Sequence, residues 1–375
     1  MFLRVLHFYK ASLPESQGGV EQFIYQLARG SAQQGVEVDV LSLNSGKLNE
    51  TRRFENYTIH QVHRDFEIAS TAVSVRAIAK FTSLARMADL IHFHFPWPFA
   101  DFVHFVTAAS KPTILTYHSD IVRQQALLKI YRPLMNRFLG DVDSIVATSQ
   151  NYLESSEALA RFREKTSVIP IGLDPSTYPV PESSVTARWL EELGNRFFLF
   201  VGVLRYYKGL HLLIEANRGV DYPLVIVGAG PVEAELRRHA ADACLTRTRF
   251  LGALPDVDKV ALFNLSYAVV FPSHLRSEAF GISLLEGAMF GKPMISSEIG
   301  TGTSYINSHQ ETGLVVAPGD PDALREAMQY LYDNPAGAAE MGRQAHSRYL
   351  RYFTAGQMVD RYIDLYREVI TKRQS

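Results

Sequence analysis

The sequence has one cysteine, Cys244, in 375 residues, so no disulfide can form within the chain. This is typical of a reducing compartment. Long hydrophobic runs are also missing: residues 197–204 are too few, and prolines, histidines and an aspartate interrupt residues 90–106. A membrane-spanning helix needs about 20 apolar residues. The opening MFLRVLHFYK has too short an apolar run for a signal peptide. We therefore expect a cytoplasmic protein without a spanning helix.

The chain also lacks a large net charge of either sign. The formal charge is −1, and basic and acidic residues are evenly distributed over the two halves of the chain. A nucleic-acid-binding surface would be markedly basic, so we expect no nucleic-acid partner. No repeat of about 20–50 residues is present, which excludes a solenoid or a propeller. With 47% hydrophobic residues, the chain is long enough for two globular domains.

Strand-like and helix-like segments alternate along the first half of the chain. Short apolar runs predict strands at 3–8, 37–43, 59–62, 90–95, 113–118, 144–148 and 166–169. Amphipathic segments predict helices at 20–34, 73–86, 99–109, 123–139 and 150–162. This alternation is typical of a parallel sheet covered by helices.

Residues 170–184 interrupt the alternation, because they hold four of the 17 prolines, and proline disrupts helices and central strands. We interpret them as a linker. A second alternation follows, with strands at 197–204, 224–227, 248–251, 267–271, 293–296 and 313–316. Helices are predicted at 209–217, 232–243, 257–265, 281–290, 321–332 and 354–372. The fold class is therefore α/β, with two doubly wound parallel-sheet domains whose ligands bind at the carboxyl edges of the strands.

The strongest chemical motif is EAFGISLLE, in which Glu278 and Glu286 stand eight residues apart. Ala279, Phe280 and Gly281 precede a predicted helix, and free backbone N–H groups at a helix N-terminus can bind phosphate. The two carboxylates could accept hydrogen bonds from sugar and ribose hydroxyls. The spacing alone is equally compatible with two solvent-exposed glutamates beside a loop.

The Glu-x7-Glu motif followed by Gly-Lys-Pro resembles the signature of retaining GT-B glycosyltransferases of family 4, the group 1 glycosyl transferases. The resemblance extends over the chain through GGVEQ, TYHSD, VIPIGLD, GVLRYYKG, VIVGAGP, FLGALPD and ETGLVVAPGDPDAL. It implies two Rossmann-like domains facing across a cleft. Residues 1–175 would bind the acceptor, residues 185–352 would bind the nucleotide-sugar, and the helix 353–375 would pack on the N-terminal domain.

The resemblance also implies residue roles. Glu286 would bind the ribose of the donor, Glu278 would contact the donor sugar, and the backbone around Gly281 would meet the diphosphate. Arg205 and Lys208 would neutralise the leaving diphosphate, since cations there stabilise the charge that develops during transfer.

The GVLRYYKG segment departs from the commoner family pattern, in which arginine follows the glycine directly. Val203 stands after Gly202 here, and we assign the arginine's place to Arg205. Without the resemblance, this segment would be a solvated turn at the start of a helix.

Glycines in two further loops fit a close approach of backbone to ligand. The resemblance implies that the Gly18–Gly19 loop closes over the donor phosphates and that Gly230 and Leu254 line the nucleotide pocket. It also implies that the backbone at Gly202 binds the donor. A glycine pair alone predicts only a turn. VIVGAGP lacks the third glycine and the acidic residue of a dinucleotide-binding fingerprint, so a nicotinamide-dependent dehydrogenase is disfavoured.

Three histidines lie in or after predicted strands. His118 ends a strand, and the resemblance places it beside the donor sugar as a catalytic residue, although a histidine there is also commonly structural. His92 and His94 alternate along one strand and so share a face. Two ligands are too few for a metal site, and we favour packing or acceptor contact for them. We predict neither a metal nor a cofactor.

The segment 123–139 combines apolar positions with four basic residues, Arg123, Lys129, Arg132 and Arg137. It could be an interfacial helix at an anionic membrane, where a lipid-linked acceptor would lie. It could equally be a surface helix docked on the sheet. Pro133 argues against one continuous helix.

The prediction is therefore a metal-independent, retaining hexosyltransferase of surface-polysaccharide synthesis. The segments resemble those of bacterial mannosyltransferases, which implies GDP-mannose as donor and a saccharide or lipid-linked oligosaccharide as acceptor. The location would be cytoplasmic, with peripheral contact at the inner face of the cytoplasmic membrane. The alternatives are a nucleotide-sugar epimerase, a disaccharide synthase and a non-catalytic nucleotide-binding protein.

Overall fold

The computed structural model describes residues 3–16, 18–46, 49–68, 71–107, 110–121 and 125–374. The chain divides into two compact units. Unit 1 comprises Met1–Gly172 and Ala355–Ser375, and unit 2 comprises Leu173–Thr354. The last helix, α15 (Ala355–Gln374), thus belongs to the same unit as the first half of the chain.

Unit 1 is built on an eight-stranded sheet in the order β10-β9-β8-β7-β1-β2-β4-β3. The strands are β1 (Arg4–Phe8), β2 (Glu37–Asn44), β3 (Glu50–Phe54), β4 (Tyr57–His63), β7 (Leu90–Phe95), β8 (Thr113–Tyr117), β9 (Ser144–Ala147) and β10 (Thr166–Val168). All neighbours are parallel except β3, which pairs antiparallel with β4. The sequence did not predict β3, because this polar edge strand contains no apolar run.

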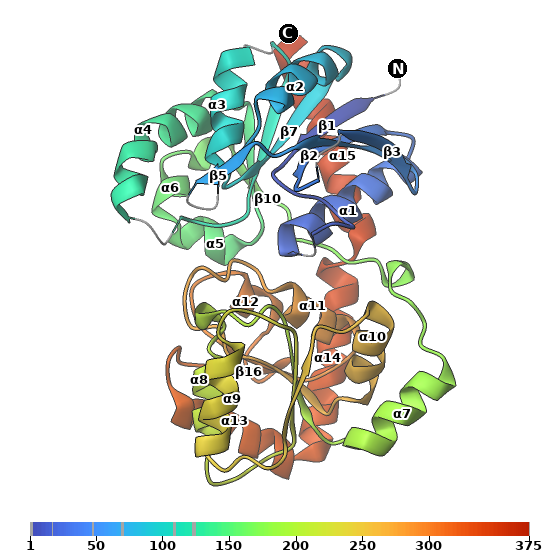
Figure 1. The fold of residues 1–375 in the computed structure, drawn as a ribbon, viewed down its shortest axis with the longest axis vertical. Coiled ribbons are helices and arrows are strands. Elements are labelled where there is room, and N and C mark those ends of the chain that lie inside the picture. Colours follow the sequence, from blue (N-terminus) through green and yellow to red (C-terminus); the bar gives the residue numbers. More distant parts are fainter. Residues whose placement is uncertain are drawn as a thin grey trace. The chain divides into compact units, whose positions relative to one another are not determined.

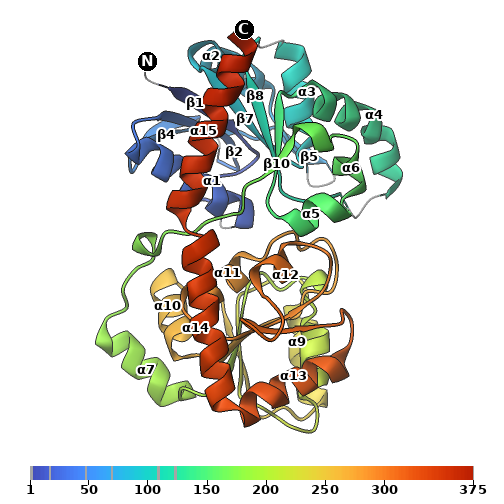
Figure 2. The same cartoon turned by 180° about the vertical axis from the view of Figure 1, so that it is seen from behind.

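Helices cover both faces of this sheet. They are α1 (Gly19–Gln33), α2 (Val75–Met87), α3 (Pro98–Thr107), α4 (Gln125–Asp141), α5 (Gln150–Ser155), α6 (Glu157–Ala160) and α15, and a separate hairpin consists of β5 (Phe66–Ile68) and β6 (Thr71–Val73). Helices α1 and α15 lie side by side across one face (Figure 2). They approach so closely that a Cβ on Gly30 would lie 2.5 Å from Val359 Cγ2.

Two predictions for this unit were wrong in detail. Helix α4 continues through Pro133, although proline interrupts helical hydrogen bonding. Arg123 of the predicted basic segment lies outside the described residues. The single helix predicted at 150–162 is instead divided, because Ser156 ends α5 and its side chain caps α6.

Unit 2, which runs from green to red in Figure 1, is built on a six-stranded parallel sheet. The strand order is β13-β12-β11-β14-β15-β16. The strands are β11 (Phe198–Val201), β12 (Leu224–Val227), β13 (Thr248–Gly252), β14 (Ala268–Phe271), β15 (Met294–Ser297) and β16 (Gly313–Val316). Strands β11, β12, β14 and β15 are short and buried along their whole length, whereas the edge strand β13 is partly exposed. Strands buried on both faces form near-continuous apolar runs, which is why the sequence predicted them well.

The helices of unit 2 are α7 (Ser183–Leu193), α8 (Leu210–Asn217), α9 (Glu233–Asp242), α10 (Asp256–Leu265), α11 (Ile282–Met289), α12 (Gly302–Ile306), α13 (Pro321–Asp333) and α14 (Pro335–Tyr352). Helices α7, α12 and α14 were not predicted. A signal for α14 was present, since Ala338, Met341, Ala345 and Tyr349 are buried at helical spacing.

The sheet order places a topological switch point in each unit. In unit 2 the first strand, β11, is flanked by β12 on one side and by β14 on the other. In unit 1, β1 is flanked by β2 and β7. Chain connections leave these strands in opposite directions, and ligands of such sheets bind at the carboxyl ends of the strands beside the switch point. Of the helices among the described residues, none is both long and apolar enough to cross a membrane.

Candidate active site

Two predicted site residues meet at the switch point of unit 2. Lys208 follows β11 and Glu278 follows β14, and Lys208 Nζ donates a hydrogen bond to Glu278 Oε2. Both side chains are buried, with 9% exposure each. Ser273 Oγ donates to the same carboxylate oxygen at 3.3 Å. A buried charge is tolerated when it is paired and hydrogen-bonded, and each of these residues satisfies the other.

The backbone explains why Lys208 reaches this position. Lys208 ends a single 3₁₀ turn, Tyr206–Lys208, and Gly209 follows in the left-handed region with φ of 72°. A Cβ on Gly209 would lie 2.0 Å from the carbonyl oxygen of Pro272, so only glycine fits. The backbone N–H of His274 donates to the carbonyl of Tyr207 at 3.0 Å. The loops after β11 and β14 are therefore bound together, and the lysine is held between them.

Glycines bring a third loop against the first. Gly202 N donates to Val227 O at 3.0 Å, and Gly228 has φ of 132°. A Cβ on Gly228 would lie 1.9 Å from Gly202 O, and one on Gly230 would lie 2.3 Å from Leu204 O. These contacts are with backbone, which cannot move aside like a flexible side chain. The predicted close approach at Gly202 and Gly230 is thus between two loops of the protein.

The segment before α11 has the predicted form of a helix N-terminus. Gly281 is the N-cap, with φ of 97°, and no side chain caps the first turn. The carbonyl of Ala279 accepts a hydrogen bond from Gly302 N at 2.8 Å, and Phe280 is buried. Backbone N–H groups of the first helical turn lack partners within the helix, so they are the groups that a phosphate can bind.

Glu286 lies on α11, eight residues after Glu278, and has a different environment. It is half-buried on α11, and its Oε1 accepts a hydrogen bond from Tyr178 Oη at 3.0 Å. Burial raises the pKa of Glu286 to about 7, against the opposing effects of the Lys259 charge and the Tyr178 hydrogen bond. A carboxyl group of this kind can accept hydrogen bonds from a diol once it is ionised.

Two other predicted residues of unit 2 are more exposed. Arg205 is exposed and forms no ion pair with any residue that the structure describes. Leu254 is half-buried in the loop between β13 and α10, two residues after the left-handed Gly252 and within the sequence stretch expected to line the nucleotide pocket. The position of Arg205 leaves it available to an anion, whereas Lys208 is already paired.

The glycines of the first loop in unit 1 have ordinary backbone conformations. Gly18 is the N-cap of α1 with φ of −140°, which any residue can adopt, and Gly19 begins the helix. Tolerance of positive φ is therefore not the reason for glycine at these two positions. Space is a better reason at Gly18, where a Cβ would lie 2.4 Å from Glu21 Oε2. Gln17 lies outside the described residues.

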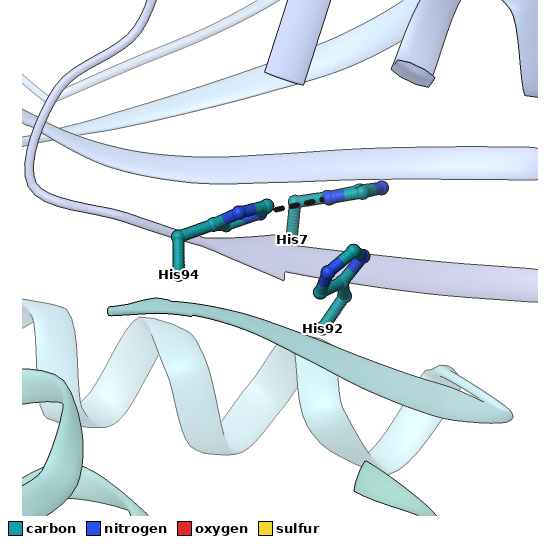
Figure 3. A group of neighbouring side chains, drawn as sticks. All are labelled: His7, His92 and His94. Carbon is teal, nitrogen blue, oxygen red and sulfur yellow. Dashed lines mark hydrogen bonds between the residues drawn. The ribbon is translucent and has the colours of Figure 1, made fainter. Parts of the chain in front are cut away.

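His118 follows β8 at the carboxyl edge of the unit 1 sheet and is 5% exposed. Its Nε2 is 3.2 Å from Nδ1 of His94, and Nε2 of His94 is 3.1 Å from Nδ1 of His7. His92 and His94 share a face, as predicted, and His7 on β1 joins them (Figure 3). Sequence spacing could not reveal His7, because 87 residues separate it from His94.

Asp-x-Asp pairs, which hold the donor diphosphate through a cation in metal-dependent glycosyltransferases, occur at 141–143, 256–258 and 320–322. One carboxylate of each pair supports the fold. Asp143 accepts from Thr113 N at 2.7 Å, Asp258 accepts from Trp189 Nε1 at 2.8 Å, and Asp320 caps α13. These pairs therefore have structural partners.

Sequence reasoning missed two side chains that contact the predicted residues. Ser273 contacts Glu278 from the end of β14, and Tyr178 contacts Glu286 from 108 positions away in the sequence. A serine directly after a buried strand at the switch point is a usable signal. No local pattern indicates Tyr178, which lies in the proline-rich segment.

Unit 2 therefore presents a cation, two carboxylates and a helix N-terminus at and near one sheet edge. This combination suits a ligand with an anionic group and several hydroxyls. The cation and the helix N-terminus can bind diphosphate oxygens. The carboxylates can accept hydrogen bonds from hydroxyl groups on either side.

Comparisons with known proteins agree with this interpretation. Residues 185–348 match the family model described as glycosyl transferases group 1, and residues 17–177 match that of glycosyltransferase family 4. The chain is 57% identical over 353 residues to D-rhamnosyltransferase WbpZ of Pseudomonas aeruginosa, covering 94% of this chain and 93% of that protein. It is 46% identical over 371 residues to O-antigen chain mannosyltransferase C of Escherichia coli, covering 99% and 100%.

A solved structure shows the same fold. Sucrose-phosphate synthase from Thermosynechococcus elongatus superposes with a TM-score of 0.79 over 99% of this chain and 100% of that chain, at 21% identity. The predicted GT-B fold, with two Rossmann-like domains, is confirmed by this likeness and by the two parallel sheets.

Proposed function

The chain belongs to the glycosyl transferases group 1, and from this premise we propose that it transfers a mannosyl group from GDP-mannose to a saccharide acceptor with retention of configuration. The chain is a hexosyltransferase of surface-polysaccharide synthesis. The proposal adds the donor, the stereochemistry and the roles of individual residues.

The observation that carries the proposal is the Lys208–Glu278 pair at the switch point of unit 2. Lys208 and Glu278 are hydrogen-bonded to each other. A bound nucleotide-sugar would offer the lysine a diphosphate oxygen and the glutamate a sugar hydroxyl. The two partners would then exchange one buried ion pair for two ligand contacts, which limits the desolvation cost of binding.

The chemistry can be written without a covalent enzyme intermediate. The bond from the anomeric carbon to the diphosphate oxygen breaks, and the bond from that carbon to the acceptor oxygen forms on the same face of the sugar. The acceptor proton passes to the leaving diphosphate oxygen. Lys208, Arg205 and the N–H groups at Gly281 would stabilise the charge that grows on the diphosphate. The remaining contribution is the positioning of the two substrates.

We propose the following roles for the remaining residues. Glu286 would bind the ribose through its ionised carboxylate, and Gly202, Gly230 and Leu254 would lie against the nucleotide. His118 would contact the donor sugar from unit 1. The backbone of the Gly18–Gly19 loop would approach the phosphates, with a small N-cap residue leaving room for it.

Mannose is favoured because the names of the two relatives described above specify sugars of the manno configuration. One is a D-rhamnosyltransferase and the other a mannosyltransferase. D-Rhamnose is the 6-deoxy form of D-mannose, so the two sugars differ only at carbon 6. We propose that the hydroxyls at carbons 2 to 4 are recognised and that GDP carries the sugar.

A thermal-shift panel tests the donor directly. Specific binding raises the unfolding temperature by mass action. GDP-mannose and its 6-deoxy counterpart should raise it more than UDP-glucose, UDP-galactose or ADP-glucose at equal concentration. A larger shift with a UDP-sugar would refute the assignment of the donor. Product analysis by NMR should then show an α-linked product from the α-linked donor.

The same assay separates the other activities. A nucleotide-sugar epimerase would convert the donor without acceptor, and a non-catalytic protein would bind donor without transfer. We expect neither result. Because our proposal involves no metal, excess EDTA should leave the transfer rate unchanged, and a loss that added Mg²⁺ restores would contradict it.

We also propose that unit 1 contacts the anionic inner surface of the cytoplasmic membrane, where a lipid-linked acceptor would lie. The basis is α4, on which Leu127 and Ile130 are 49% and 79% exposed beside the exposed Lys129 and Arg132. Exposed apolar side chains next to cations favour binding to anionic lipid. Pocket-lining residues from β5, β6 and α4 form an apolar hollow beside them.

Vesicle sedimentation tests this contact. Wild-type protein should co-sediment with vesicles containing phosphatidylglycerol, and less with pure phosphatidylcholine. Ile130→Asp should reduce binding, whereas Val180→Asp, at a 90% exposed position of unit 2, should not. Equal loss in both variants would remove α4 from the contact.

A further inference from the structure

Four histidines are buried on one face of the unit 1 sheet, beneath α1 and α15. His7 lies on β1, His92 and His94 on β7, and His118 after β8, with exposures of 0%, 0%, 1% and 5%. The strand register explains the arrangement, since His7 pairs with His92 and His94 pairs with Thr116. The rings of His92, His94 and their neighbours stack at centroid distances of 4.5–5.4 Å.

The eight ring nitrogens fall into two separate hydrogen-bonded chains. The first runs from His118 Nε2 to His94 Nδ1 and from His94 Nε2 to His7 Nδ1, at 3.2 and 3.1 Å. It ends at His7 Nε2, which is buried and has no partner among the described residues. The second runs from Tyr366 through His92 to Thr116 and Tyr362, at 2.7–2.8 Å.

A divalent cation does not fit this cluster, although His7, His92 and His94 form the one group of potential ligands found among the described residues. Both nitrogens of His92 are bonded to hydroxyls, and both nitrogens of His94 are bonded to other rings. No carboxylate acts on His7, His92 or His94 to compensate a buried charge. Hydrogen bonding accounts for the nitrogens without a metal.

Each ring in the first chain is neutral, because burial lowers the pKa of His7 and of His118 to about 3 and also lowers the pKa of His94 well below its usual value. A neutral imidazole has one N–H donor and one bare acceptor nitrogen. The direction of either hydrogen bond therefore dictates the other. Only two arrangements of the whole chain are possible.

The two arrangements differ at both ends. In one, His7 donates to His94 and His94 donates to His118, so the proton of His118 lies on Nδ1. In the other, every bond is reversed, and His7 carries a buried N–H without an acceptor. Buried N–H groups without acceptors are the rarer defect in proteins. The first arrangement is accordingly favoured.

We propose that His94 and His7 are positioning residues that hold His118 in the Nδ1-protonated tautomer, so that it presents an N–H donor at the carboxyl edge of the sheet. This deepens the proposed function and rests on it, since the acceptor of that hydrogen bond is an oxygen of the donor sugar. Phe23 supports the geometry, since its ring packs edge-on against that of His118 with 4.9 Å between the ring centroids. The ring nitrogen bonded to His94 cannot serve the ligand, which leaves Nδ1.

The first test is the tautomer itself. In protein labelled with ¹⁵N-histidine, the imidazole shifts of His118 should identify Nδ1 as protonated and Nε2 as bare. His7→Met replaces the donor at the far end with a thioether, which can only accept a hydrogen bond. The reversed chain then has an acceptor for the N–H of His94, so both tautomers of His118 should appear. A wild-type His118 protonated on Nε2 would overturn the proposal, and this result needs no variant. An unchanged single tautomer in His7→Met would also overturn it.

His92→Phe is the matched control, because His92 is equally buried on the same face but belongs to the second chain. It should leave the His118 tautomer unchanged. His7→Asn supplies an amide N–H donor near the position of Nδ1 and should restore the single tautomer, although its side chain fills less space than methionine. If packing decided the tautomer, His7→Met would instead be closer to wild type than His7→Asn.

Transfer rates connect the tautomer to the reaction. His94→Phe should lower kcat by roughly threefold to tenfold with little change in nucleotide affinity, which is the size expected for one hydrogen bond. An unchanged kcat with mixed tautomers would overturn the role of the chain in transfer. Absence of transfer by the wild-type protein would instead contradict the proposed function, and the tautomer measurement would remain valid.

Discussion

At the residue scale, two glutamates of one motif have different chemistry. Glu278 is paired with Lys208, whereas Glu286 accepts a hydrogen bond from Tyr178 and has a pKa raised by burial to about 7. The difference follows from position. Glu278 lies beside a cation at the switch point, and Glu286 projects from the second turn of α11. The two side chains are therefore suited to different hydroxyl groups and to different pH ranges.

Replacing Lys208 with methionine should lower kcat by about 100-fold or more, because a group that stabilises developing charge has an effect of this order. Steady-state kinetics with saturating donor measures it. Lys292→Met is the matched control, since Lys292 is a partly buried lysine of the same unit whose Nζ binds the carbonyls of Asn264 and Ser266. That variant should lose stability and retain turnover. A near-normal kcat for Lys208→Met would show that the diphosphate is neutralised elsewhere.

The raised pKa of Glu286 predicts a pH dependence of nucleotide binding. The carboxylate must be ionised to accept ribose hydrogen bonds, so affinity should tighten by about tenfold between pH 6 and pH 8. Calorimetric titration with GDP at several pH values measures this. Glu286→Gln should bind more weakly and without this dependence. A wild-type affinity independent of pH would exclude Glu286 from the ribose contact.

The same pKa has an opposite consequence for folding. The folded protein binds the Glu286 proton more tightly than the unfolded chain does, so this group contributes less to the free energy of unfolding as pH rises from about 4.5 to 7. Glu286→Gln has no carboxyl group at this position, so its free energy of unfolding does not fall with pH for this reason. Its melting temperature relative to wild type should therefore be higher at pH 8 than at pH 5.

At the element scale, the site depends on close contacts between loops. Glycine is needed at these contacts, because any side chain there would collide with the neighbouring backbone. The loop after β12 lies against the loop after β11 through Gly228 and Gly230, and the turn at Gly209 lies against the end of β14. Each contact is backbone to backbone. The glycines that follow these short strands therefore allow the three neighbouring loops to pack together at one edge of the sheet.

Gly228→Ala should destabilise unit 2 and weaken nucleotide binding. The new Cβ would lie 1.9 Å from Gly202 O, and φ is 132°. Overpacking of this kind costs about 1–3 kcal/mol. Gly219→Ala is the matched control, with φ of 82° and nothing within 4 Å of the added Cβ. It should lose about 1 kcal/mol from backbone strain alone and bind nucleotide normally. Urea unfolding and calorimetry would compare them, and equal losses would count against the loop contact.

At the scale of the whole molecule, each unit has its own sheet, core and switch point. Unit 1 is discontinuous, because α15 returns to it from the far end of the chain. Tyr362 and Tyr366 of that helix donate or accept hydrogen bonds with Thr116 and His92 beneath it at 2.8 Å. The last helix is therefore part of the core of unit 1.

Deleting residues 355–375 should lower the unfolding temperature of unit 1, since it uncovers a sheet face that contains buried polar side chains. Scanning calorimetry should still show the transition of unit 2, and GDP should still raise it. Tyr366→Phe, which removes one hydroxyl, should have a much smaller effect. A deletion that leaves both transitions unchanged would contradict the assignment of α15 to the core.

The sequence by itself predicted most of the elements and the chemistry of the motif. Strands β7, β12 and β16 begin and end where expected, because a strand buried on both faces must be a continuous apolar run. The motif residues Glu278 and Lys208 carry charge beside glycines after such strands, which is a local pattern. The charged edge strand β3 was missed because it has no apolar run to detect.

Only the tertiary structure decided which side chains meet. Lys208 pairs with Glu278 across 70 positions, His94 with His7 across 87 and Glu286 with Tyr178 across 108. Local periodicity carries no information about such partners, since sheet order and register bring them together. The pKa of a buried carboxyl and the tautomer of a buried imidazole depend on those partners and on burial, and so both are properties of the folded chain alone.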